Sequence, residues 1–407
     1  MSDIRKLSGI FLPVGTDGEA EREQLRALVA KKLGAPVRFF RIVKKSLDAR
    51  DKSKIRWVYT IEFAANPVPA PDVPGEKGTC KDGTPRVLVV GMGPAGLFCA
   101  VRLLQWGVRP VLIERGGPVE ERERDIKEFF DTGRLNVDSN IQFGEGGAGT
   151  FSDGKLNTQT NSAENAEVLR LFSAFGAPEE ILYLNKPHIG SDRLKTVLKN
   201  MRAYILSHGG KILFHTALTD VRIEGGALRS VTLSDGNRYF FDAVVLAIGH
   251  SARDTFALLQ RQGVCLQQKE FAVGVRIEHL QEKIGFAQYG KSYALLPPAD
   301  YKLVSHASER AAFTFCMCPG GFVMPSASEE GMVVTNGMSN YRRDGKNANS
   351  ALIVQVKRED FGSDDPLAGV AFQRRLERAA YALGGGAYRA PAPRAADLLL
   401  RRPPPRA

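Results

Sequence analysis

Residues 87–114 read VLVVGMGPAGLFCAVRLLQWGVRPVLIE, which is a short apolar run, a GxGxxG turn, a helical stretch and a second apolar run that ends in an acid. This order predicts a strand, a tight turn, a helix and a second, parallel strand. Gly91 allows the turn, Gly93 lets backbone N–H groups approach a pyrophosphate, and Gly96 lets the helix pack closely on the strand. Glu114 can accept hydrogen bonds from an adenosine ribose. The stretch therefore predicts a dinucleotide-binding βαβ unit. The alternative is a glycine turn that only tightens the junction.

The totals describe an ordinary globular protein. With 407 residues, 43% of them hydrophobic and 25% charged, the chain has room for two or three domains. It contains no apolar run of membrane-spanning length, and its first residues lack the features of a secretory signal. Five scattered cysteines are too few for a disulfide framework. We therefore expect a soluble, cytoplasmic protein with no membrane partner.

The net charge of +11 raises the question of a nucleic-acid partner, because many basic residues gather in residues 38–56. A basic face of this kind can meet RNA phosphates. The interpretation we prefer is a solvated strand surface, with Phe39, Phe40 and Trp57 in the core of a small domain rather than stacked on bases. RNA stays the alternative partner, and a small molecule is the expected substrate.

Composition and periodicity divide the chain into five parts. Strand and helix patterns predict a small α+β domain, a stretch rich in proline and glycine predicts a linker, and a nucleotide-binding domain with a β-rich excursion over 211–241 precedes a strand-rich substrate domain. The end of the chain is rich in proline and arginine, and we treat it as a separate, atypical tail. The expected bounds are 1–65, 66–85, 86–264, 265–383 and 384–407.

A second glycine-dense segment, FGEGGAGTFSDGKLNT, covers residues 143–158. Backbone with so little side-chain bulk can wrap a phosphate or a flat ring, and the alternative is a flexible surface loop. We expect it to form part of the nucleotide site.

Catalytic residues are harder to assign from the residues alone. His188, His250, Arg276 and His279 are candidate acids, bases or ligands, although no metal-ligand spacing links the histidines and the interpretation we prefer for each is an ordinary satisfied or surface side chain. No metal site is expected. The catalytic residues are therefore left unassigned.

Cys316 and Cys318 lie two residues apart, so on a regular strand both thiols face one way. One interpretation is a dithiol that passes electrons. The other is a pair of small apolar fillers, because a disulfide between such neighbours is strained within a regular strand. The sequence leaves both open.

Pro94-Ala95 inside the first turn, followed by Ile113-Glu114-Arg115-Gly116, resembles the form found in FAD-binding proteins of the glutathione-reductase structural class. The strings SNIQFGEGGAGTFSDGKL, VVLAIGHSARDTF and FCMCPGG, with others along nearly the whole chain, are similar to a family of bacterial FAD-dependent dehydrogenases of undefined substrate. The resemblance implies an α/β chain. It would have a Rossmann-like, three-layer FAD/NAD(P)-binding fold, a β-rich inserted substrate domain and a small α+β N-terminal module.

The resemblance also implies a set of FAD-binding positions, in the first turn, after the second strand, in the second glycine segment and at the strand end before His250. These are Gly91, Gly93, Pro94, Ala95, Gly96, Glu114, Arg115, Gly144, Gly146, Gly147, Gly149, Thr150 and Gly249. By the same resemblance Lys155 lies nearest the flavin N1 and C2 carbonyl, where negative charge collects on reduction, and Asn157 donates a hydrogen bond there. The weak catalytic candidates are Lys155, His188, Arg276, Cys316 and Cys318.

The family implies an FAD-dependent oxidoreductase, a dehydrogenase that passes hydride or electron pairs through the flavin, with NAD(P)H as a candidate donor. The chain departs from the family at its end, which predicts a truncation that removes part of the wall around the flavin ring. Two alternatives stay open: an FAD-containing, RNA-associated protein akin to flavoproteins that modify tRNA, and a degenerate remnant without flavin.

Overall fold

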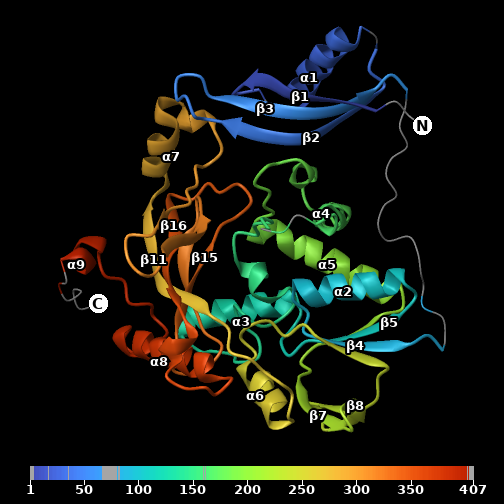
Figure 1. Cartoon of the computed structure of the whole chain (residues 1–407), viewed down its shortest axis with the longest axis vertical. Helices are drawn as coiled ribbons and strands as arrows, with labels where there is room; N and C mark the ends of the chain where they lie inside the picture. The colour runs from blue at the N-terminus through green and yellow to red at the C-terminus, as the bar shows by residue number, and fades with distance from the viewer. Residues whose placement is uncertain are drawn as a thin grey trace.

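The computed structural model describes residues 4–16, 18–34, 36–66, 80, 83–158, 160, 162–400 and 402. Most of the expected linker and the last residues of the chain lie outside this range. The described chain is a mixed α/β structure with several sheets, arranged along the long axis of Figure 1 with the N-terminal module at one end. Among the described residues, no helix is both long and apolar enough to cross a bilayer.

The N-terminal module is an antiparallel sheet of order β1-β3-β2 with one long helix on it (Figure 1). Leu25 and Val29 of the helix are fully buried against Tyr59 and Ile61 of the sheet, as expected for the face of a helix that packs on a sheet. The elements are β1 (Arg5–Pro13), α1 (Gly18–Leu33), β2 (Phe39–Asp48) and β3 (Arg56–Ala64).

The centre of the molecule is a parallel sheet of order β10-β4-β5-β6. Its strands are β4 (Arg86–Val90), β5 (Arg109–Ile113), β6 (Lys211–Leu213) and β10 (Ala243–Leu246). Helix α2 (Pro94–Gln105) connects β4 to β5, so the strand, turn, helix and strand predicted over 87–114 are all present. The expected β-rich excursion divides between two sheets, because β6 pairs with β5 and only the strands after it form a separate sheet.

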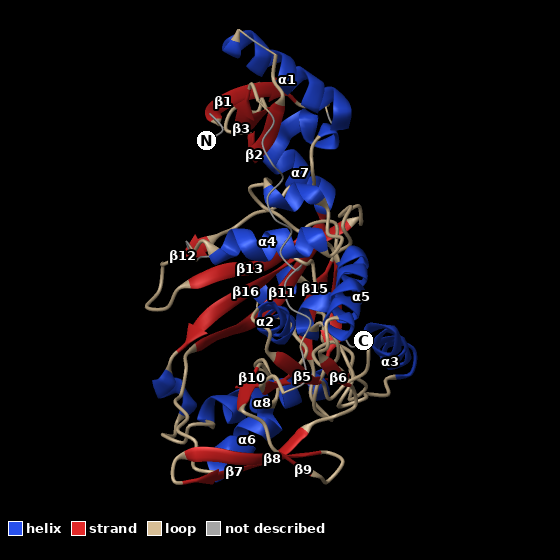
Figure 2. Ribbon diagram, turned by 90° about the vertical axis from the view of Figure 1, so that its right-hand side faces the viewer, coloured by secondary structure: helices blue, strands red, loops and turns tan. Residues whose placement is uncertain are grey.

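The strands of the parallel sheet carry apolar side chains on both faces, so helices or a second sheet must cover each face. Val89 and Leu112 pack with α2 and α5 (Ser191–Ser207) on one face. Leu88 and Val111 pack on the other face with α6 (Arg253–Arg261) and the sheet β7-β8-β9, which lies at the opposite end of the molecule from β1–β3 in Figures 1 and 2. The strands of that sheet are β7 (Leu218–Glu224), β8 (Ala227–Leu233) and β9 (Arg238–Tyr239).

The C-terminal part is built on an antiparallel sheet of order β11-β16-β13-β12, with the hairpin β14-β15 beside it (Figure 2). Its strands are β11 (Phe271–Leu280), β12 (Val304–Ser305), β13 (Ala312–Cys318), β14 (Phe322–Ser326), β15 (Val334–Met338) and β16 (Asn347–Val356). The remaining α-helices are α3 (Val119–Thr132), α4 (Glu164–Ala174), α7 (Gln281–Tyr289), α8 (Ala368–Leu383) and α9 (Ala395–Leu399). Short 3-10 turns are η1 (Gly147–Phe151), η2 (Glu179–Leu182), η3 (Gly290–Leu295) and η4 (Arg358–Phe361).

Part of the expected tail, 384–407, is helical, because α9 covers Ala395–Leu399. Arg394 precedes the first turn and its guanidinium Nε donates to Asp397 Oδ2 at 2.7 Å, while the Asp397 N–H donates to the Arg394 carbonyl. Alanine and leucine, both good helix formers, fill the remaining positions.

Candidate functional site

The turn after β4 leaves the N-terminus of α2 open to an anion. Gly91 adopts a left-handed φ of 98°, and Gly93 is the N-cap of α2, with no side-chain cap and no acid in the first turn. Pro94 and Ala95 are exposed. The positive end of the helix and its unpaired first-turn N–H groups are what a phosphate prefers.

The glycines of this turn have different tasks. A Cβ at Gly96 would overlap the carbonyl oxygen of Gly91, so this glycine is required for the helix to pack on the strand. A Cβ at Gly93 would meet only the Cα of Gly147, at 3.9 Å. The protein's own packing therefore does not explain a glycine at position 93.

The second glycine segment packs directly on the first turn. The Gly146 N–H donates to the Met92 carbonyl at 2.8 Å, and a Cβ at Gly147 would come within 3.1 Å of the Gly93 Cα. A Cβ at Gly149 would contact nothing within 4 Å, whereas Thr150 is buried and donates to the Glu145 carbonyl. We call residues 91–96 and 144–150 together the glycine cradle.

Glu114 holds the two halves of the cradle together. Its carboxylate is 5% exposed; Oε2 accepts the N–H of Met92 at 2.8 Å, and Oε1 accepts the N–H groups of Gly116 and Gly144, each at 3.0 Å. A carboxylate has about four acceptor sites. Oε2 therefore keeps capacity for a further donor, such as a ribose hydroxyl.

Arg122 is a cradle residue that the sequence analysis missed. It is fully buried on α3 and its guanidinium donates to the carbonyls of Asn140, Ile141, Glu145 and Gly147 at 2.7 to 2.8 Å. Burial lowers its pKa to about 9. A signal existed in the sequence, because this position shares the helical spacing of the apolar face of α3.

A small pocket opens beside the cradle, with a volume of about 40 Å³. Gly91, Glu114 and Arg115 contribute to its wall. Arg115 donates to both carboxylate oxygens of Asp254 at 2.9 Å. The other lining residues are Val90, Ile113, Phe143, Thr216, Ala217, Leu218, Ile248, Ala252 and Thr255. Gly249, with a left-handed φ of 67° and nothing within 4 Å of a built Cβ, follows this wall directly.

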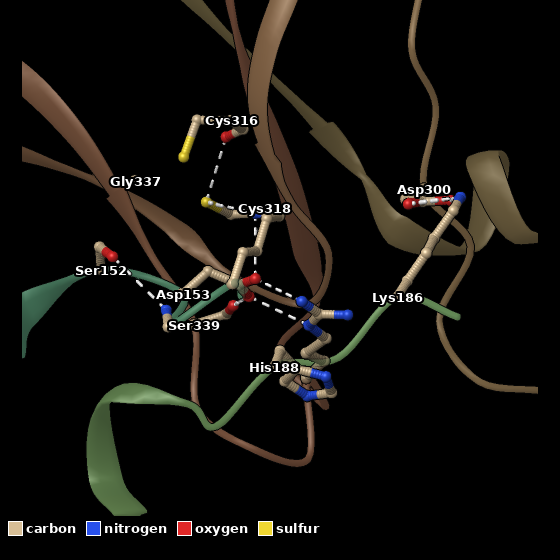
Figure 3. A network of polar contacts seen from close by, with 12 residues as sticks. Ser152, Asp153, Lys186, His188, Asp300, Cys316, Cys318, Gly337 and Ser339 are labelled. Atoms are coloured by element: carbon tan, nitrogen blue, oxygen red, sulfur yellow. Dashed lines mark hydrogen bonds and ion pairs between the residues drawn. The ribbon is translucent and has the colours of Figure 1, made fainter. Parts of the chain in front are cut away.

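A second constellation follows the cradle in the chain and gathers all five weak catalytic candidates. Cys316 and Cys318 lie at the end of β13, where Lys155 Nζ and Arg276 NH2 each approach Cys318 Sγ at 3.7 Å. Figure 3 shows the two cysteines side by side, with Asp153, Ser339 and His188 below them. His188 forms an isolated β-bridge with Lys155. We call Lys155, Arg276, Cys316 and Cys318 the dithiol cluster.

The strand is not regular at the two cysteines. Phe315 pairs with Ala351 of β16 and Cys318 with Asn349, so one extra residue is inserted on β13 as a bulge. Cys316 takes a left-handed φ of 48°. The expectation of two thiols on a flat strand therefore fails at this point, and so does the objection to a disulfide that rested on it.

The charges around the two sulfurs favour a single thiolate. The Cys318 thiol donates to the Cys316 carbonyl oxygen at 3.3 Å. Its proximity, helped by Lys155 and Arg276, lowers the pKa of the Cys316 thiol despite burial. The proximity of Cys316, together with burial, raises the pKa of Cys318. The pair thus loses its first proton readily and its second with difficulty. Cys316 is half-buried and Cys318 fully buried.

Asp153 balances the cations beneath the cysteines. Burial opposes its ionisation, but Arg343, Lys155 and Ser339 outweigh this and lower the pKa of the carboxyl. Lys155 Nζ lies 3.0 Å from Asp153 Oδ2, and Arg343 and Ser339 also bind the carboxylate. Asp153 therefore fixes the position of the Lys155 ammonium.

His188 is held as a neutral imidazole. Burial, with a contribution from Arg343, lowers its pKa to about 4, and its Nε2 lies 2.8 Å from the Tyr341 carbonyl. Two other candidates lie apart from this cluster: His250 contacts Ser251, and His279 contacts the Tyr301 hydroxyl. Asn157 is exposed.

Four basic side chains of the segment 38–56 in the N-terminal module contact acids. Arg41 binds Glu62, and Lys45 lies 2.5 Å from Glu21. Asp48 is close to two further cations, Arg50 and Arg56. Trp57 and Phe40 pack against the module's core. These contacts reduce the charge available to RNA.

Two family models match parts of the chain. Residues 270–406 match a family described as "FAD-dependent protein, C-terminal domain-like", and residues 10–64 match a domain of unknown function (DUF8436). An uncharacterized protein from Clostridium beijerinckii is 43% identical over 380 residues, which cover 89% of this chain and 71% of that protein.

Solved structures give only distant likenesses. A tetracycline destructase is 12% identical with a TM-score of 0.32, and the match covers 72% of this chain and 62% of that one. PqsL from P. aeruginosa, solved with 2-aminobenzoylacetate, is 14% identical with a TM-score of 0.35, and the match covers 76% of this chain and 72% of that one. TM-scores this low support no argument about this protein.

Proposed function

This chain belongs to the same protein family as the uncharacterized protein from Clostridium beijerinckii, and because residues 270–406 match the FAD-dependent family, we propose that it is an FAD-dependent oxidoreductase acting on a small molecule. The observation that carries the proposal is Gly93: an N-cap glycine whose Cβ would contact nothing closer than 3.9 Å within the protein. Close approach of a pyrophosphate explains that glycine.

The residues present fit an ADP group. The open N-terminus of α2 suits the phosphates, and the free acceptor capacity of Glu114 Oε2 suits a ribose hydroxyl. The small pocket lined by Gly91 and Arg115 lies next to that carboxylate. The layers around the site also support a Rossmann-like fold, which we propose for this domain. Its parallel sheet has α2 and α5 on one face and β7–β9 with α6 on the other.

The segment from Gly144 to Lys155 would hold the rest of the cofactor. Bound FAD would supply the capacity to accept and pass on hydride or electron pairs. The chain's contribution is positional: the cradle offers backbone close to the ligand, and Asp153 holds the Lys155 ammonium where negative charge is stabilised. NAD(P)H is a candidate donor, and the substrate itself is the other.

The experiment is the visible spectrum of the purified full chain, followed by identification of the flavin released on denaturation. We expect a flavin spectrum, FAD as the released species, and anaerobic bleaching by NADH, NADPH or a screened substrate. Protein that purifies colourless and takes up no added FAD would overturn the proposal. Salt-dependent RNA binding by the same sample would favour the RNA-associated alternative instead.

A further inference from the structure

The two thiols of the dithiol cluster can undergo redox chemistry without FAD. We propose that Cys316 and Cys318 form a redox-active dithiol that reduces low-molecular-weight disulfides, with Cys316 as the attacking thiol and Cys318 as the resolving thiol. The assignment of roles follows from access, because Cys316 is half-buried and Cys318 has no exposed surface.

Simple packing does not account for this arrangement. A left-handed backbone is strained for a non-glycine residue, and the protein retains it at Cys316 inside a bulge. Backbone outliers of this kind gather at functional sites. Apolar fillers also have no need for two cations, yet Lys155 and Arg276 each lie 3.7 Å from Cys318 Sγ. Their charge also favours a thiolate on the neighbouring Cys316.

Neighbouring residues hold the Arg276 guanidinium in position beside the two cysteines. Its NH2 donates to the Cys316 carbonyl at 2.9 Å and its Nε to Asn349 Oδ1 at 2.9 Å. A Cβ at Gly337 would overlap the guanidinium, so that glycine makes room for it. Asn349 is fully buried, yet its Nδ2 has no partner among the described residues. An incoming polar group at the cluster would satisfy it.

The chemistry balances within the cluster and its substrate. The Cys316 thiolate attacks one sulfur of the substrate disulfide, forming a mixed disulfide and releasing one thiolate. Cys318 gives its proton to the departing thiolate or to water and attacks the Cys316 sulfur. The Cys316–Cys318 bond forms, the second substrate thiolate leaves, and the electron pair has passed from the protein to the substrate.

The test uses dithiobis(nitrobenzoate), itself a disulfide, at one equivalent under anaerobic conditions on reduced full-length protein. Cys265 is exposed, so the experiment runs in a Cys265→Ser background to remove its reaction. We expect release of two thionitrobenzoates per chain and an intact mass that has lost only two hydrogens. Peptide mapping should place the new bond between Cys316 and Cys318. A stable adduct on Cys316, or no reaction at either cysteine, would overturn the proposal.

Variants separate the two roles. Cys318→Ser should release one thionitrobenzoate and keep the other as an adduct on Cys316, and Cys316→Ser should abolish the fast phase. Equal rates in Cys316→Ser and the parent would contradict the assignment. The mass measurement on the Cys265→Ser parent leaves Cys316 and Cys318 unchanged, so the proposal stays testable if Cys318→Ser does not fold.

Lys155 acts as a positioning residue and has its own readout. Lys155→Met should slow the Cys316 reaction about tenfold at low pH, the factor that corresponds to one pKa unit of lost thiolate, and should shift the pH profile of the rate upward. Lys155→Arg should restore the profile. An unchanged profile in Lys155→Met would contradict this role. Because the visible spectrum is recorded separately, failure of thiol exchange and failure of FAD binding are distinguishable.

Discussion

Glu114 Oε1 accepts the backbone N–H of Gly144 at 3.0 Å, joining the end of the second parallel strand to a loop 30 residues further along the chain. The same oxygen accepts the N–H of Gly116, and Oε2 accepts that of Met92. A residue that the sequence identifies as a ribose ligand is therefore also the structural link between the two glycine loops. Binding a ribose hydroxyl and joining the two loops both require a carboxylate, because each of its oxygens accepts a hydrogen bond from a backbone N–H.

Glu114→Gln should destabilise the protein even without a ligand. The substitution replaces one acceptor oxygen by an amide NH2 that faces a backbone donor, so at least one buried N–H loses its partner, which costs about 1–3 kcal/mol. Denaturant unfolding of flavin-free protein measures the loss, with the exposed Glu309→Gln as the control. An unfolding free energy equal to that of the control would show that Glu114 does not hold the loops.

Arg122→Met should cost more. It removes the donor for several buried carbonyls of the second loop, and loss of such a buried cationic group costs about 3 kcal/mol or more. Arg124→Met, at an exposed position on the same helix, is the matched control. We expect α3 to remain folded in the Arg124 variant and the Arg122 variant to unfold at markedly lower denaturant. Similar midpoints for the two would refute the role assigned to Arg122.

Stability should fall as the pH drops from 6.5 to 4, in part because of His188. Its pKa is about 4 in the folded protein and 6.5 in the unfolded chain, so between these values only the unfolded state takes up the proton. Above pH 6.5 His188 is neutral in both states and does not destabilise the fold. As the pH falls below 6.5, proton uptake by the unfolded chain lowers the free energy of unfolding. The pKa of Asp153 is also lowered in the folded protein, so its contribution to stability is lost only as the pH falls below 3.8, the value in the unfolded chain.

His188→Gln should make the free energy of unfolding depend less steeply on pH between 4 and 6.5. The slope should decrease by less than about 1.4 kcal/mol per pH unit, which is the largest slope that one proton can produce. Unfolding free energies across the interval measure it, with the exposed His306→Gln as the control. A slope unchanged from wild type would mean that His188 titrates normally in the folded state.

The sequence predicted the elements best where local pattern and packing agree. The βαβ unit around Gly91 and the α1–β3 module follow from periodicity and turn chemistry, and both are present. It also placed Gly91 and the second glycine segment at one site, although only by resemblance. The convergence of Lys155, Arg276 and Cys316 was beyond it, because these residues come from three distant segments joined by tertiary pairing.

Two local features had no sequence signal. The bulge at Cys316 depends on register with β16, which alternation along one strand does not reveal. The pairing of the basic strand with Glu21 and Glu62 depends on neighbours across the sheet and on α1. Charge counts in one segment of the sequence cannot detect such partners.

The two glycines of the first turn offer a matched pair for the central claim that a dinucleotide lies across the glycine cradle. Gly96→Ala should destabilise flavin-free protein, since its Cβ would overlap the Gly91 carbonyl. Gly93→Ala should leave the unfolding free energy within about 0.5 kcal/mol of wild type, because its Cβ has room.

The most direct measurement is therefore an FAD titration of flavin-free wild type and Gly93→Ala. The account predicts that wild type binds FAD and that Gly93→Ala, though as stable, binds it at least about tenfold more weakly, a loss of about 1.4 kcal/mol. Equal FAD affinity in the two proteins, or none in wild type, would contradict it.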